Sequence, residues 1–110
     1  MKITVTGINA RAMDTQRAYA EYRLFTSIAS HESWVRDATV VICHDASARQ
    51  FVCSVFVDLG RWGRVKTQAR AAHPSAAIDR AARRAGWLVD RRLGGDSGIQ
   101  AREPAARAEA

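Results

Sequence analysis

Three consecutive segments alternate apolar with polar residues, and only short turns separate them. The segments cover residues 35–44, 50–59 and 64–70. Alternation with a period of two is typical of a β-strand that buries one face. The connections 45–49 and 60–63 are short enough to form hairpins, and the second has a glycine at each end. The pattern therefore predicts three neighbouring antiparallel strands.

The expected inward face of these strands is apolar, and the outward face of the last strand is basic. In the segment 50–59 the inward set includes Val55 and Val57, and in the segment 64–70 it includes Val65. A strand that buries one face places every second side chain toward the core. The predicted outward cations of the last strand are Arg64, Lys66 and Arg70.

One more strand and two helices complete the pattern. Residues 2–7 alternate like a strand that stops at Gly7, residues 14–29 have helical composition, and Pro74 precedes a second helix over 75–93. The predicted class is α+β: a two-layer β-α-β-β-β-α domain with a four-stranded mixed sheet and both helices on one face. The helical crossover makes the first two strands parallel, and the hairpins make the other pairs antiparallel.

The chain has 110 residues, the size of one domain. We expect the domain to cover residues 1–93 and residues 94–110 to be a disordered C-terminal tail, because Ile99 is the tail's one large aliphatic residue. No apolar run approaches the roughly 18 residues that cross a membrane. The N-terminus lacks the apolar stretch of a secretory signal, and two cysteines form no disulfide framework. We therefore expect a cytoplasmic protein with no membrane partner.

The positive charge is concentrated in one part of the sequence. The net charge is +6, and residues 61–92 carry nine basic and two acidic groups, which is a net +7. Such a block favours a polyanionic partner, and arginine binds phosphate with two parallel hydrogen bonds. The alternatives are a solvated helix face and an arginine content that follows genomic base composition.

No enzyme motif is present. The seven glycines form neither a dinucleotide fingerprint nor a phosphate-binding loop. Cys43 and Cys53 could nearly face each other across a hairpin beside His44, but a metal or redox site would need further ligands. We read both cysteines as small apolar strand residues. The prediction is a non-enzymatic protein with no metal, no cofactor and no small-molecule substrate.

Aromatic residues accompany the arginines. Trp62 lies in the second turn and Trp87 on the polar side of the second helix, where each could stack on an exposed base. Arg83 could instead lie over Trp87 as a local cation–π pair. Trp34 is expected in the core or in an interface.

The sequence resembles the ribosome hibernation-promoting factors, a family that includes the ribosome-associated inhibitor and is often labelled as modulators of sigma-54. The resemblance covers residues 1–93. It rests on the opening strand at 1–7, the order of elements, the sequence Ala-Ala-Ile-Asp at 76–79 and the first-helix pattern formed by Arg17, Tyr19, Arg23 and Leu24. Members are similar in fold to double-stranded-RNA-binding domains.

The resemblance implies a stress-response factor that regulates translation. Members bind rRNA in the mRNA and tRNA channel of the small ribosomal subunit and preserve idle ribosomes. By position, Arg23, Arg84 and Arg91 stand where members have basic residues. Together with the residue pattern, this predicts an rRNA-binding set of Arg23, Arg64, Lys66, Arg70, Arg80, Arg83, Arg84, Trp87 and Arg91.

The sequence also departs from the family pattern. Thr26 and Ser27 stand where members have a basic residue and leucine, Arg83 replaces an acid, and Trp87 stands at a position where a basic residue is common. Long members have a separate C-terminal dimerisation domain, which we expect to be absent here. A weak homodimer stays an open alternative. Two alternatives therefore stay open: a general structured-RNA-binding module, and a protein-interaction module of the same fold that no longer binds ribosomes.

Overall fold

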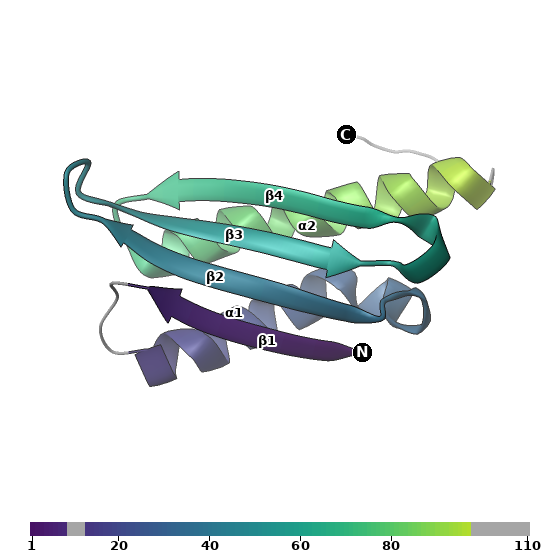
Figure 1. Ribbon diagram of the computed structural model, residues 1–110, viewed down its shortest axis with the longest axis horizontal. Coiled ribbons are helices and arrows are strands. Elements are labelled where there is room, and N and C mark those ends of the chain that lie inside the picture. Colours follow the sequence, from purple (N-terminus) through teal and green to yellow (C-terminus); the bar gives the residue numbers. More distant parts are fainter. Residues whose placement is uncertain (9–12, 98–110) are drawn as a thin grey trace.

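The computed structural model describes residues 1–8 and 13–97 as a mixed four-stranded sheet with two helices packed on one face (Figure 1). In sequence order the main elements are β1 (Lys2–Ile8), α1 (Met13–Ile28), β2 (Asp37–Asp45), β3 (Gln50–Asp58), β4 (Arg64–Ala71) and α2 (Pro74–Ser97). Strands β1 and β2 are parallel, and the β2–β3 and β3–β4 pairs are antiparallel. The predicted two-layer α+β fold is confirmed.

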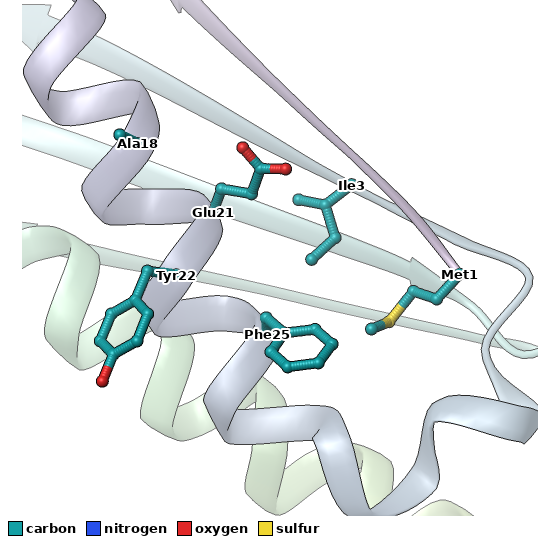
Figure 2. Close-up of a pocket in the computed structure, with 6 residues that line it drawn as sticks. All are labelled: Met1, Ile3, Ala18, Glu21, Tyr22 and Phe25. Atoms are coloured by element: carbon teal, nitrogen blue, oxygen red, sulfur yellow. The ribbon is translucent and has the colours of Figure 1, made fainter.

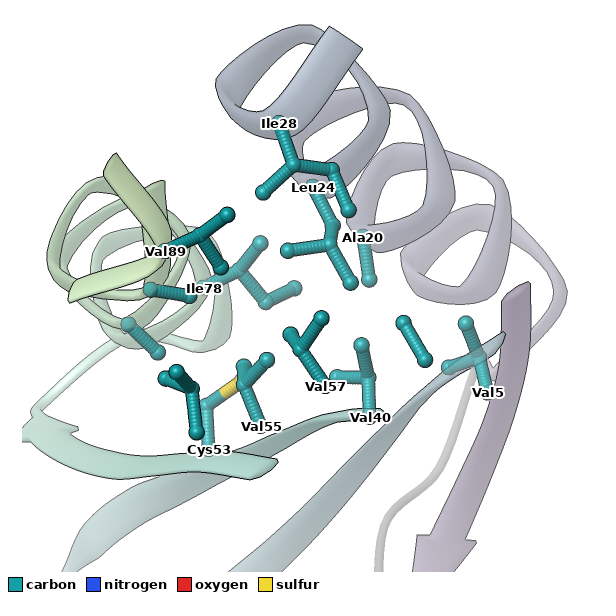
Figure 3. Packing of buried hydrophobic residues seen from close by; sticks show 14 of the residues in the cluster. Val5, Ala20, Leu24, Ile28, Val40, Cys53, Val55, Val57, Ile78 and Val89 are labelled. Carbon is teal, nitrogen blue, oxygen red and sulfur yellow. The ribbon is translucent and has the colours of Figure 1, made fainter. Parts of the chain in front are cut away.

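The predicted inward and outward faces of the strands are also correct. Val40 lies opposite Val55 and Ala38 lies opposite Val57 in the antiparallel register, and all four side chains are buried. Figure 3 shows Val40, Val55 and Val57 pointing toward the helix layer, where Leu24 of α1 and Ile78 of α2 lie. The core therefore lies between the sheet and the helix layer, and within residues 1–8 and 13–97 no helix covers the opposite face of the sheet.

Several element boundaries differ from the predictions. The residues between α1 and β2 form a 3₁₀ helix, η1 (Ala29–Trp34). A second 3₁₀ helix, η2 (Gly60–Trp62), occupies the predicted turn before β4. The glycines on that turn have the expected positive φ, 63° at Gly60 and 95° at Gly63. Helix α2 runs through Gly94 to Ser97 instead of ending at residue 93, so 94–97 are not part of a tail. The rest of the predicted disordered tail, 98–110, lies outside the described residues.

Helix α1 buries a narrow stripe. Ala20, Leu24 and Ile28 are buried, whereas Tyr22 and Phe25, which form a second apolar stripe in the sequence, are 64% and 41% exposed. Phe25 and Tyr22 instead line an open groove of about 360 Å³ beside β1, together with Met1, Ile3, Ala18 and Glu21 (Figure 2). No helix in the described part of the chain is long and apolar enough to span a bilayer.

Candidate nucleic-acid interface

The solvent side of α2 carries five of the predicted site residues. Buried Ala81, Ala85 and Val89 hold the helix against the sheet, so the residues on its opposite side face solvent. We call this side the α2 outer face. It consists of Arg80, Arg83, Arg84, Trp87 and Arg91, all of which are exposed.

Two of these arginines also cover the free edge of the sheet. The guanidinium of Arg80 donates to the carbonyl of Arg70 at 2.9 Å, and that of Arg84 donates to the carbonyl of Gln68 at 3.4 Å. Strand β4 is an edge strand, and unpaired edge carbonyls invite pairing with another chain. A guanidinium has five N–H donors, so each arginine keeps donors for a phosphate.

Trp87 forms a cation–π pair with Arg91 and not with Arg83, the arginine expected from the sequence. The guanidinium carbon of Arg91 lies 4.8 Å from the centre of the Trp87 ring. The cation that stacks on Trp87 therefore lies one turn after it in α2, whereas Arg83 lies one turn before it. Trp87 remains 46% exposed, so the helix presents a cation stacked on an accessible aromatic surface.

The strand cations lie on the other side of the molecule. Arg64, Lys66 and Arg70 point away from the helix layer, onto the open face of the sheet. Each has a neighbour there. Arg70 pairs with Asp45 at 3.2 Å, Lys66 lies 5.7 Å from the Phe56 ring centre, and Arg64 is opposite Asp58 in the strand register. The structure therefore divides the predicted positive surface between two layers that face opposite ways.

Arg23 lies between the two helices. Its Nε donates to Asp79 Oδ1 at 2.8 Å, and the Tyr19 hydroxyl donates to the same oxygen at 2.5 Å. The hydrogen bond from Tyr19, followed by that from Arg23, lowers the pKa of the Asp79 carboxyl, and the bond to Asp79 raises the pKa of both Tyr19 and Arg23. The family-like residues of the two helices thus meet at one carboxylate, a contact that sequence reasoning missed.

The two helices also touch where Gly86 faces Ser27. A Cβ on Gly86 would lie 2.7 Å from the backbone oxygen of Ser27, so only glycine allows this approach. Glycine lowers the stability of a helix relative to alanine. Its presence inside α2 is therefore the feature of the sequence that indicates a close contact at this position.

The cysteines form no site. The expectation that they nearly face each other is wrong, because Cys53 points into the core and Cys43 lies on the open face of the sheet. Burial raises the pKa of the Cys53 thiol to about 12, so it stays protonated and unreactive. Within residues 1–8 and 13–97, no three histidine, cysteine or acidic side chains gather as metal ligands.

Solved structures share this fold. No protein-family model and no curated protein sequence matches the chain. The N-terminal domain of Protein Y from Thermus thermophilus matches with a TM-score of 0.68 and 28% identity, over 83% of this chain and 98% of that domain. A ribosomal subunit interface protein from Coxiella burnetii matches with a TM-score of 0.68 and 14% identity, over 89% and 99% of the two chains.

The match to Protein Y covers most of both chains at 28% identity, whereas the match to the Coxiella protein, at 14% identity, shows the fold alone. The resemblance to the ribosome hibernation-promoting factor family that the sequence indicates is therefore confirmed by the solved structures that this chain matches.

Proposed function

We propose that this protein is a non-enzymatic ribosome-associated factor that inhibits translation by occupying the mRNA and tRNA channel of the small ribosomal subunit. The observation that carries the proposal is the α2 outer face, where four arginines and an exposed tryptophan share one side of a helix. The likeness to Protein Y and to a protein named for the ribosomal subunit interface supports this assignment. The cellular setting that we propose is the cytoplasm of a stressed cell.

The chemistry of this surface suits an rRNA backbone. Arginines bind phosphate oxygens through directed pairs of N–H groups, and such contacts position a protein without reading the base sequence. The ring of Trp87 can contact an unstacked base. On this surface Arg84 and Arg91 would make the main phosphate contacts, with Arg80 and Arg83 beside them.

Arg23, Arg64, Lys66 and Arg70 have a secondary place in the proposal. Arg23 is only half-buried and keeps donors beyond the one that Asp79 occupies. The three strand cations would touch RNA only if the open face of the sheet also lay against the subunit. Charge-reversal variants on the α2 outer face and on the open face of the sheet show how much each face contributes to ribosome binding.

The test is co-sedimentation with 30S, 50S and 70S ribosomal particles at low and moderate salt. Wild-type protein is expected with 30S and 70S but not with 50S, and retention should fall as salt rises. Arg84→Glu combined with Arg91→Glu should remove this binding. Arg64→Glu with Lys66→Glu changes the charge equally on the open face of the sheet and should keep most of it.

Thermal unfolding of both double variants shows whether the fold survives. Unchanged sedimentation of the Arg84 and Arg91 variant would contradict the assignment of the α2 outer face. Equal affinity of the wild type for arbitrary duplex RNA and for 30S would favour a general structured-RNA-binding module.

A further inference from the structure

Two tryptophans meet at the end of the domain where η1, η2 and the C-terminal part of α2 lie together (Figure 1). Trp34 ends η1 and Trp62 ends η2, with ring centres 6.1 Å apart and ring planes at 76°. In an edge-to-face pair, Trp62 can cover at most one flat face of Trp34. Trp34 is 51% exposed, so about half of this residue is accessible to solvent.

Three arginines surround this pair, and we call them together with Trp34 and Trp62 the tryptophan corner. The guanidinium carbon of Arg61 lies 5.3 Å from the Trp62 ring centre, and Arg92 donates to the Trp62 carbonyl at 3.0 Å. The side chain of Arg36 runs beside Gly60, where an added Cβ would lie 3.3 Å from Arg36 Cδ. All three arginines are exposed.

Three acidic residues lie in the same segments as the three arginines of the corner, so the formal charges of these six residues balance. One oxygen of Asp58 is already occupied by the Gly60 N–H at 2.9 Å. Glu32 and Asp37 are exposed and lie on either side of Trp34 in the sequence. Arg61 lies over the Trp62 ring and Arg36 lies beside Gly60, so both bring N–H donors for an anion to the turn that carries Trp62.

The backbone that carries the two rings is held firmly. The Val35 N–H donates to the Glu32 carbonyl at 3.2 Å, and Val35 itself is buried. The Arg36 N–H donates to the Asp58 carbonyl at 2.8 Å, which joins the end of η1 to the end of β3. Trp62 packs partly against the core. The exposed indole is therefore presented on an anchored segment, which lowers the ordering cost of binding.

We propose that the tryptophan corner binds one unpaired nucleotide of single-stranded RNA. The base would stack on the open face of Trp34, and its phosphate would contact Arg61 and Arg36. A flat uncovered aromatic face gives sequence-tolerant stacking, and guanidinium groups beside it supply phosphate contacts. The site is separate from the α2 outer face and does not depend on ribosome binding.

The experiment measures the affinity of the full chain for a fluorescein-labelled oligouridylate and for duplex RNA by fluorescence anisotropy. Trp34→Ala should weaken oligouridylate binding about five-fold or more. It should leave duplex binding unchanged, because paired bases are not available to stack. Trp34→Leu keeps an apolar contact with Trp62 but removes the flat ring, so it should show the same loss.

The control is Tyr22→Ala, which removes an exposed aromatic residue from α1 without changing the charge. It should bind both RNAs like the wild type. In a Trp87→Phe background, oligouridylate should also quench the fluorescence of the remaining tryptophans, and Trp34→Leu should reduce this quenching.

Wild-type affinity of both Trp34 variants for oligouridylate would overturn the proposal. An equal loss for single-stranded and duplex RNA would overturn it too, because stacking on an unpaired base would then not explain the effect. Neither result bears on the sedimentation of the Arg84 and Arg91 variant, so the two proposals can fail separately.

Discussion

A single glycine determines how closely the two helices approach each other. At Gly86 the backbone of α2 comes so near to Ser27 that an added Cβ would lie 2.7 Å from the Ser27 carbonyl oxygen. Backbone atoms cannot move aside as the end of a flexible side chain can. The helix therefore carries a residue of poor helical propensity at this position, because any side chain would push the helices apart.

Gly86→Ala is expected to destabilise the protein, although alanine favours helices by about 1 kcal/mol. The clash with Ser27 resembles overpacking of a core, which costs about 1–3 kcal/mol, so the loss exceeds the gain. Urea unfolding measures the difference. Gly94→Ala is the matched control, since a Cβ there meets nothing within 4 Å, and its stability should stay equal or rise. A more stable Gly86→Ala protein would show that the helices separate freely.

At the level of elements, the two helices are joined by one charged network. Asp79 of α2 accepts hydrogen bonds from Tyr19 and Arg23 of α1, and these bonds lower its pKa below the ordinary value of 3.8. A carboxyl whose pKa is depressed by folding stabilises the folded state at pH values above its unfolded pKa. That contribution is lost as the pH falls through the folded pKa.

Asp79→Asn should therefore be less stable than the wild type at neutral pH. The difference should shrink as the pH falls below the ordinary carboxyl pKa and through the lowered pKa of the folded state, where the wild-type carboxylate also becomes protonated. Chemical unfolding from neutral to acidic pH checks this. Asp37→Asn, which removes an exposed carboxylate from β2, controls for the change in net charge. A gap between wild type and Asp79→Asn that stays constant with pH would show that the network contributes through packing alone.

The sequence predicts the sheet better than it predicts the helix contacts. Alternation places Val55, Val57 and Val65 on the buried face because a strand repeats every two residues, and the structure confirms this. The Asp79 network and the Gly86 contact join residues about sixty positions apart, and no local pattern carries such information. The edge contacts of Arg80 and Arg84 depend on how α2 lies beside β4, which the helical period alone does not define.

At the scale of the whole molecule, the domain has a helix layer, a covered sheet face and an open sheet face. This division explains why the rRNA-binding residues predicted from the sequence do not share one face of the domain. Arg83 and Arg91 of α2 and the cations of β4 are close in the sequence but lie on opposite sides of a two-layer body, and Arg80 and Arg84 reach the edge of β4 between them. An RNA lying flat on the α2 outer face therefore leaves the open sheet face free.

Neighbouring residues of β3 test this division directly. Val55 is 1% exposed in the core, and Phe56, the next residue, is 39% exposed on the open face. Val55→Asp would bury an unpaired carboxylate, at a cost of about 3 kcal/mol or more. A small domain has only about 5–15 kcal/mol of stability in total, so most of this variant should be unfolded or easily denatured by urea.

Phe56→Asp introduces the same side chain on the same strand, but into solvent. It removes the contact between Phe56 and Lys66 and places a carboxylate near that cation instead. Its stability should therefore stay within about 1 kcal/mol of the wild type. Circular dichroism during urea unfolding compares the two variants. A stable Val55→Asp protein beside an unfolded Phe56→Asp protein would mean that the helices cover the other face of the sheet, and the two positive surfaces would then exchange places.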